Sequence, residues 1–401
     1  MKGLIVDAGL KGLSGHNLAY TNAVRSALES EGCPVEVLAN KNLPSGLAGA
    51  EPYRRTFSLG AFDFPPGRGA MRNLTYLYAQ SLIHAHELEA ALETIDEPAF
   101  VFCHTVADFE LISWSRVLAR RRMRSRLMIL LRHTDGFRQR GRLQKWLHPY
   151  WRIRPHYLNA IYARTAGRFV LMTDSDLLTE DYRSIFPHRI VTLPIPVRQA
   201  PASMERAPGG PTIQVRVGYL GDARPSKGFD LLGPAILKAL SSGPPTSAFV
   251  VQCSLGAGAT GPASVAQLIR LNEQFGERLI LLSQQLSEGE YARLLGSLDV
   301  VLLPYLDQKY GESTSGIFAE ALALGTPVVV SDGTWMAREL RRSGGGLEFR
   351  RGDSDDLADK IGSLLLDLGT YRARARAFAA EWRSYHNPQG LARLLLREAC
   401  L

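Results

Sequence analysis

The feature that most constrains the fold is an alternation of short apolar runs with polar loops and helix-like segments. Such runs are typical of strands in a parallel sheet that helices cover on both faces, because both sides of each strand are then buried. In the first half of the chain the predicted strands are residues 4–8, 34–39, 99–104, 126–133 and 169–173. Helices are predicted at 16–31 and 71–95, and the Pro- and Gly-rich residues before the second helix, up to about residue 69, are predicted to form a loop.

The same alternation starts again after a proline-rich stretch in the middle of the chain. Five prolines and two glycines fall between residues 194 and 211, a composition typical of a linker. Strands are predicted after it at 213–219, 247–253, 278–282, 298–303, 327–331 and 346–349. A chain of 401 residues is also long for one hydrophobic core. We therefore predict an α/β protein of two doubly wound parallel-sheet domains that face each other across a cleft.

This division predicts a first domain at residues 1–195, a linker at 196–212 and a second domain at 213–380. Residues 381–401 are expected to form a C-terminal helix, for which packing on the first domain is one option.

Composition narrows the class of protein. The chain is 45% hydrophobic and 21% charged, as is ordinary for a soluble globular protein. Its four cysteines are scattered without a CxxC pair, which indicates a reducing compartment and no structural zinc. The first apolar run is too short for a signal peptide, and no run approaches the roughly 20 residues of a spanning helix. We expect a cytoplasmic protein, with peripheral attachment to the inner face of the plasma membrane as an option.

The net charge of +8 belongs to the first half of the chain. Residues 1–200 contain 26 basic and 18 acidic residues, whereas 201–401 contain 21 of each. Within 110–154 there are 13 basic and 2 acidic residues. Aromatic side chains accompany these arginines at Phe137, Trp146, Tyr150, Trp151 and Tyr157. This mixture of arginines and aromatic residues favours attachment of the protein, through residues 116–154, to an anionic membrane surface that bears a lipid-linked acceptor. Nucleic-acid binding, which we do not expect, and a solvated face are the alternatives.

Residues 303–332 are predicted to form the end of a strand, a polar loop, a short helix that ends at Gly325, and a second buried strand. Three consecutive hydroxyl side chains can cap that helix, namely Ser313, Thr314 and Ser315. Glu312 lies in the loop, and Glu320 follows eight residues later inside the helix. A helix N-terminus between two carboxylates, at the carboxyl end of a parallel strand, can bind an anionic ligand that carries hydroxyls.

A second loop, in residues 215–232 (VRVGYLGDARPSKGFDLL), carries two cations three residues apart. Arg224 and Lys227 follow the turn at Gly221, where both can reach one diphosphate and neutralise it as a leaving group. The alternative is that both are solvated loop charges. Their coincidence with a helix terminus and two carboxylates in the same domain favours a nucleotide-sugar site.

The motifs GYLGDARPSKGFDLL, E-x7-E and EALALGTPVVVSD together resemble those of the retaining GT-B glycosyltransferases of family 4, glycosyl transferases group 1, over about residues 215–367. The resemblance implies two Rossmann-like domains and transfer from a nucleotide-diphosphate sugar to a hydroxyl of a glycan or lipid-linked acceptor. It also implies a hexosyltransferase (EC 2.4) that needs no cofactor or metal and acts in polysaccharide, lipopolysaccharide or glycolipid assembly.

The resemblance also assigns roles to single residues. Arg224 and Lys227 match the cationic pair on the donor diphosphate, and Glu320 matches the acid that accepts hydrogen bonds from the ribose. Glu312 matches the acid that contacts the transferred sugar, and His133 a cleft histidine near the reaction centre. The implied catalytic residues are therefore His133, Arg224, Lys227 and Glu312. The implied donor-binding residues are Gly15, Gly221, Arg224, Lys227, Ser315, Gly316, Ile317 and Glu320. The acceptor-side candidates are His16, His104 and His133.

The chain departs from the family directly after Glu312, where Ser313 to Gly316 stand in place of glycines and an apolar residue. Donor identity therefore cannot be inferred from this loop.

Other interpretations of these residues stay open. His16, His104 and His133 could each be hydrogen-bonded structural residues, and Asp135 is explained by a turn-forming Asp-Gly pair. The Asp174–Asp176 segment is better interpreted as a helix cap than as a metal site.

Other functions also stay open. A sugar-nucleotide epimerase or a phosphorylase would share the fold, and a non-catalytic protein could bind nucleotide sugars or a lipid surface. A dehydrogenase is disfavoured because GLKGLSG lacks the GxGxxG spacing.

Overall fold

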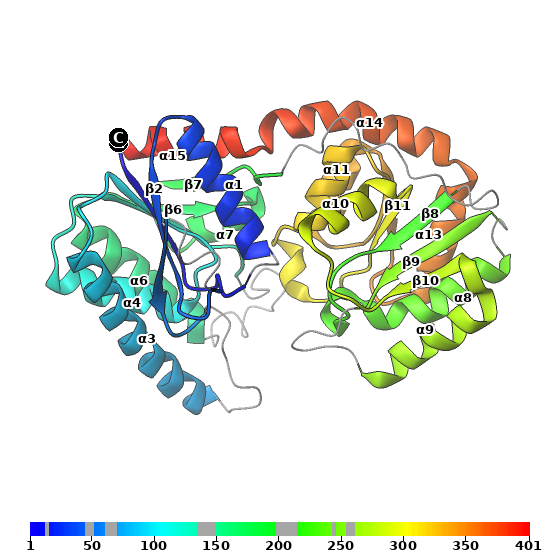
Figure 1. Cartoon of the computed structure of the whole chain (residues 1–401), viewed down its shortest axis with the longest axis horizontal. Coiled ribbons are helices and arrows are strands. Elements are labelled where there is room, and N and C mark those ends of the chain that lie inside the picture. The colour runs from blue at the N-terminus through cyan, green and yellow to red at the C-terminus, as the bar shows by residue number, and fades with distance from the viewer. Residues whose placement is uncertain are drawn as a thin grey trace. The chain divides into compact units, whose positions relative to one another are not determined.

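The computed structural model describes residues 1–12, 16–44, 52–60, 70–134, 149–197, 215–242, 246–253 and 261–401. These form two compact units (Figure 1). Unit 1 comprises Met1–Pro196 and Asn387–Leu401, and unit 2 comprises Val197–His386. The predicted linker lies for the most part outside the described residues.

Unit 1 is built on a parallel sheet in which the described residues form seven strands, in the order β3-β2-β1-β4-β5-β6-β7. The strands are β1 (Gly3–Asp7), β2 (Val35–Asn40), β3 (Tyr53–Phe57), β4 (Phe100–Cys103), β5 (Arg126–Leu130), β6 (Phe169–Thr173) and β7 (Ile190–Thr192). The helices are α1 (His16–Ser30), α3 (Ala70–Glu93), α4 (Asp108–Arg120), α6 (Pro149–Arg164), α7 (Asp176–Arg183) and α15 (Pro388–Ala399).

Unit 2 repeats the arrangement with six parallel strands among the described residues, in the order β10-β9-β8-β11-β12-β13. The strands are β8 (Val215–Tyr219), β9 (Ser247–Gln252), β10 (Leu279–Leu282), β11 (Val300–Leu303), β12 (Val328–Ser331) and β13 (Gly346–Phe349). The helices are α8 (Leu232–Ser242), α9 (Pro262–Phe275), α10 (Glu288–Ser297), α11 (Gly316–Leu324), α12 (Trp335–Ser343), α13 (Ser354–Leu366) and α14 (Leu368–Tyr385). The prediction of two Rossmann-like parallel-sheet domains is thereby confirmed.

Three details of the predicted strands were wrong. The stretch before residue 69 is not all loop, because Tyr53–Phe57 forms the edge strand β3. This strand carries two arginines and lacks the apolar run that marks buried strands. The short strand β7, Ile190–Thr192, was also missed. The strand predicted at 126–133 ends at Leu130, so His133 lies in the following loop rather than at the strand end.

The end of the chain divides between the two units. Helix α14 belongs to unit 2, where the Trp382 indole nitrogen donates to the Ala319 carbonyl of α11 at 2.9 Å. Helix α15 starts after the cap residue Asn387 and packs its apolar side chains into the core of unit 1. There the buried carboxylate of Glu398 accepts two hydrogen bonds from Arg189, at 2.7 and 2.9 Å.

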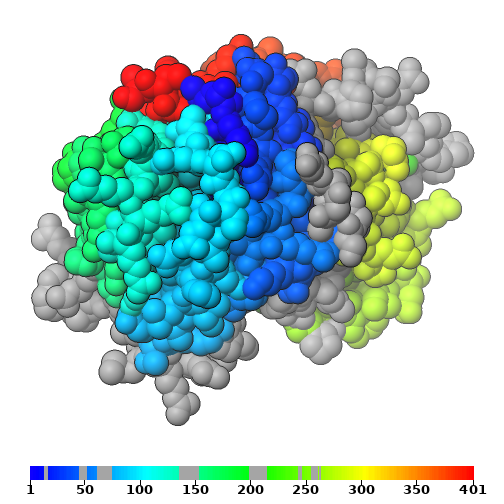
Figure 2. Space-filling view, turned by 60° about the vertical axis from the view of Figure 1, so that its left-hand side comes forward, coloured from blue at the N-terminus to red at the C-terminus, as the bar shows by residue number. Residues whose placement is uncertain are grey.

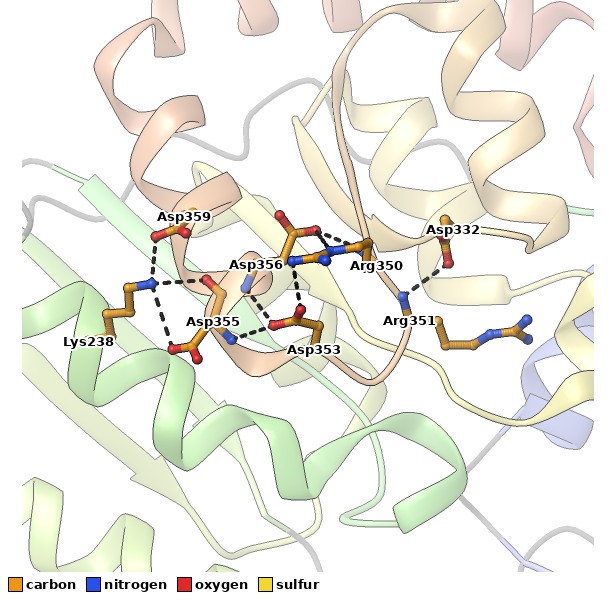
Figure 3. Close-up of polar contacts among 8 residues, drawn as sticks. All are labelled: Lys238, Asp332, Arg350, Arg351, Asp353, Asp355, Asp356 and Asp359. Carbon is orange, nitrogen blue, oxygen red and sulfur yellow. Dashed lines mark hydrogen bonds and ion pairs between the residues drawn. The ribbon is translucent and has the colours of Figure 1, made fainter.

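The acidic residues that follow β12 and β13 have structural roles (Figure 3). The Asp353 side chain caps α13 by accepting from two backbone amides of its first turn, at 2.9 and 3.0 Å. Lys238 of α8 forms an ion pair with Asp359 of α13 at 2.8 Å, which links these two helices. Asp332, after β12, accepts from the Arg351 amide at 3.0 Å.

Candidate active site

The cationic loop of unit 2 starts at the carboxyl end of β8, with Gly221 in a left-handed conformation at φ +113°. The Gly221 amide donates to the Gln252 side-chain oxygen at 2.8 Å. A Cβ on Gly221 would lie 2.9 Å from the Lys227 Nζ and 3.3 Å from the Ile317 Cδ1. Three predicted donor-binding residues (Gly221, Lys227 and Ile317) are thus brought together from two segments about ninety residues apart in the sequence.

Lys227 is buried, with 6% of its surface exposed. Its Nζ lies 5.9 Å from the centre of the Tyr305 ring, within the range of a cation–π contact. Burial, followed by the charge of Arg224, lowers the pKa of Lys227 to about 8. The alternative that this residue is a solvated loop charge is therefore wrong. Burial makes the charged form of Lys227 unfavourable. An anionic ligand compensates for this desolvation through its negative charge, so the site suits such a ligand.

Arg224 lies on the same loop and is half-buried. Its guanidinium donates to the Asp222 carboxylate at 2.6 Å. Both side chains remain accessible to solvent, so the ion pair is weak, and the guanidinium can exchange Asp222 for a phosphate at little cost. Asp222 is thus a residue of the site that sequence reasoning missed.

The N-terminus of α11 lies beside this loop. The Ser315 hydroxyl caps the helix by accepting from the Phe318 amide at 3.4 Å, as predicted for this stretch, and donates to the Tyr305 hydroxyl at 3.4 Å. Gly316 is the first helical residue, and Ile317 is buried. The helix ends at Gly325 in a left-handed conformation, also as predicted. The backbone amides at the start of this helix and the helix dipole can bind a phosphate next to Lys227.

The two predicted acids have different surroundings. Glu320 is half-buried in α11, and its Oε2 accepts from the Tyr291 hydroxyl of α10 at 2.5 Å. Glu312 follows a short 3-10 helix, Gln308–Gly311, and is fully buried. Its contact with a transferred sugar stays a prediction.

In unit 1, His104 belongs to a buried cluster at the carboxyl ends of β1 and β4. Its Nε2 lies 2.8 Å from the Thr21 hydroxyl and 3.5 Å from Asp7, and its Nδ1 lies 3.0 Å from the Thr105 hydroxyl. Burial raises the pKa of Asp7 to about 7 and lowers the pKa of His104 well below its usual value. His104 therefore has the surroundings of a hydrogen-bonded interior residue, the alternative that the sequence left open.

His133 is half-buried in the loop after β5, and its carbonyl is fixed by two donors. The Arg154 guanidinium donates to it at 3.1 Å and the Tyr182 hydroxyl at 2.9 Å. Arg154 is itself buried and pairs with Asp108 at 2.6 and 3.2 Å. Arg154 is thus not part of a basic surface, although the sequence grouped it with the arginines of 116–154.

Several predicted residues lie outside this description. Gly15, Asp135, Phe137 and Trp146 fall outside the described residues. His16 begins α1, and nothing is described of its side chain. The Asp174–Asp176 segment is a helix cap, as predicted, because the Ser175 hydroxyl accepts from the Leu178 amide.

Tyr291, Tyr305 and Gln252 also belong to the site, and no motif pointed to them. Gln252 and Tyr305 are polar or aromatic residues at or just after the ends of β9 and β11, whereas Tyr291 lies inside α10 and had no sequence signal. Over the residues described, no group of three or more His, Cys, Asp or Glu side chains is arranged to hold a metal ion. A metal-independent reaction stays a prediction.

Comparison with known proteins points to the same half of the chain. Residues 214–367 match the sequence model of the family glycosyl transferases group 1. The chain is 31% identical over 199 residues to the D-inositol 3-phosphate glycosyltransferase of Nocardia farcinica. That match covers 48% of this chain and 42% of the relative, less than half of its length.

Solved structures match over the whole chain. A trehalose-phosphate synthase from Burkholderia xenovorans, in complex with glucose-6-phosphate, has a TM-score of 0.72 at 15% identity and covers 100% of both chains. Sucrose-phosphate synthase from Thermosynechococcus elongatus has a TM-score of 0.69 at 15% identity, covering 99% of this chain and 97% of its own. An Anabaena protein in complex with UDP and glucose has a TM-score of 0.61 at 16% identity, covering 99% and 98%. Together with the two parallel sheets, these likenesses show the GT-B fold.

Proposed function

We propose that this protein is a retaining glycosyltransferase of family 4 that moves a sugar from a nucleotide-diphosphate sugar to a hydroxyl acceptor. The observation that carries the proposal is the buried Lys227 ammonium, held against Gly221 and the first turn of α11. The match of residues 214–367 to glycosyl transferases group 1 supports it, as does the bound UDP and glucose of the Anabaena structure.

In the proposed reaction the bond between the anomeric carbon and the diphosphate breaks, the acceptor oxygen bonds to that carbon, and the proton of the acceptor hydroxyl passes to the departing diphosphate. Lys227, Arg224 and the amides at the start of α11 stabilise the charge that develops on the diphosphate. Glu320 accepts from the ribose hydroxyls, and Glu312 orients the sugar. Unit 1 holds the acceptor, and His133 assists there in positioning or proton movement. These roles need neither a metal nor another cofactor.

The proposed donor site is tested by a thermal-shift screen with UDP-, GDP- and ADP-sugars, followed by product analysis. We expect at least one donor to raise the unfolding temperature, because a ligand stabilises the folded state in proportion to its affinity. The same donor should yield a glycosylated product with a retained anomeric configuration. Binding without turnover on any glycan or lipid-linked acceptor would favour the non-catalytic alternative, and an altered free sugar nucleotide would indicate an epimerase.

We also propose that unit 1 rests on an anionic membrane surface that carries the acceptor, as polysaccharide or glycolipid assembly would require. The supporting observation is an apolar face on α3, where Tyr78, Leu82 and Ile83 are 52%, 44% and 47% exposed. Helix α4 packs beside α3, and both lie on the face of unit 1 that Figure 2 shows in blue to cyan. The Arg116 guanidinium lies 4.7 Å from the Tyr78 ring centre. Further exposed arginines lie at the end of α4 and just after it, at Arg120, Arg122 and Arg124, and Arg120 pairs with Glu89 of α3 at 3.4 Å.

An exposed apolar helix face with arginines on the neighbouring helix suits a surface of anionic headgroups over acyl chains. None of the helices in the described ranges combines the length and apolar character needed to cross a bilayer.

Flotation with anionic and neutral vesicles tests this surface. We expect the protein to bind anionic vesicles only. Binding should fall at least fivefold when Leu82 and Ile83 are both changed to Asp, because each change removes apolar area that the membrane would bury and adds a charge that the anionic headgroups repel. Leu366→Asp is the matched control, since Leu366 is 86% exposed in unit 2 and should leave binding unchanged. Failure to bind either vesicle, or equal binding by the double variant, would contradict the proposal.

A further inference from the structure

Glu320 is fixed from two neighbouring helices. Its Oε2 accepts from the Tyr291 hydroxyl of α10 at 2.5 Å, a short charge-assisted hydrogen bond of the strong class. The backbone beside it is held from α14, where the Trp382 indole donates to the Ala319 carbonyl at 2.9 Å. The carboxylate and its helix therefore have separate supports.

The Tyr291 hydroxyl acts as the donor in this pair. Burial, followed by the charge of Glu320, raises the pKa of Tyr291 well above its usual value, so the phenol keeps its proton. A glutamate on a helix otherwise samples several rotamers of its flexible side chain, and binding must then fix one of them at an entropic cost. A carboxylate fixed before the ligand arrives avoids this cost.

We infer that Tyr291 is a positioning residue that orients the Glu320 carboxylate to accept from the vicinal diol of a ribonucleotide. This inference rests on the proposed function, because it assumes a nucleotide-diphosphate ligand in unit 2. Tyr291 itself need not touch the ligand. Its effect is therefore specific to ligands that carry the diol.

The experiment compares UDP, GDP and ADP with their 2′,3′-dideoxy analogues by calorimetric titration. We expect the wild type to bind one ribonucleotide at least tenfold more tightly than its dideoxy analogue. Tyr291→Phe should weaken binding of the ribonucleotide about five- to tenfold and change the affinity for the dideoxy analogue less than twofold. Tyr385→Phe, at an exposed tyrosine of α14, is the control and should change neither affinity.

The two affinities separate the possible failures. Equal weakening of both ligands would make Tyr291 a structural residue of the α10–α11 contact, and the inference would be overturned while the proposed function stands. No change in either affinity, or no preference of the wild type for the diol, would overturn the inference as well. If the wild type bound none of the three ribonucleotides, the inference and the proposed donor site would both be wrong.

Discussion

Lys227→Ala is expected to lower the rate of glycosyl transfer at saturating donor by a factor of about 10²–10³, the usual effect of losing one preorganised donor at a developing negative charge. The ammonium is buried in the loop after β8, against Gly221 and Ile317, so no mobile surface cation can replace it. A continuous transfer assay with the donor identified by screening measures the effect. A variant as fast as the wild type would exclude the loop from the diphosphate site.

Lys238→Ala is the matched control for this change. Lys238 is a half-buried lysine of α8 that pairs with Asp359 of α13, and its loss should leave the rate within about twofold (Figure 3).

The pH profile gives a second check on Lys227. Below pH 8 the Lys227 ammonium is charged with or without ligand, so its titration should not change donor affinity in this range. Above pH 8 binding must take up a proton, because a diphosphate raises the pKa of Lys227, and donor affinity should fall as pH rises.

Gly228→Ala is expected to lower the free energy of unfolding of unit 2 by about 3 kcal/mol or more. Gly228 follows Lys227 in a left-handed conformation at φ +70°, where the loop passes the end of β11. A Cβ at this position would lie 1.7 Å from the Pro304 carbonyl oxygen, so the backbone must move. The displaced loop should also bind the donor more weakly. Urea titration followed by intrinsic tryptophan fluorescence measures the stability change.

Gly352→Ala separates the clash from the backbone preference. Gly352 has a similar φ of +86°, but a Cβ there would meet nothing within 4 Å. This variant should therefore lose only about 1 kcal/mol, the cost of a left-handed conformation for alanine. Equal losses for the two variants would show that the contact with Pro304 is not what requires glycine at 228.

Local patterns were sufficient to predict most of the architecture. The β-branched runs of β11 and β12 identified buried parallel strands because burial on both faces leaves an uninterrupted apolar signal. The cap at Ser315 and the stop at Gly325 follow from the chemistry of helix ends, which acts over a few residues. The charged edge strand Tyr53–Phe57 gave no such signal.

The rest of the site depends on contacts between residues far apart in sequence. Tyr291 meets Glu320 only because α10 packs next to α11, and nothing in either segment alone indicates it. Arg154 looked like a surface arginine until its pairing with Asp108, 46 residues earlier, showed it to be interior. The burial of Lys227 could not be predicted either, because the loop that contains it has a polar composition. The sequence indicates which chemical groups the site can contain, and the fold determines which of these groups are desolvated.

Calorimetric titration of UDP, GDP and ADP into the wild type, Lys227→Ala and Lys238→Ala tests whether unit 2 binds a nucleoside diphosphate at Lys227, and it needs no knowledge of the acceptor. We expect at least one nucleoside diphosphate to bind the wild type, and Lys227→Ala to weaken this binding at least tenfold while Lys238→Ala does not. The absence of binding by all three, or equal affinity for the wild type and Lys227→Ala, would contradict this expectation.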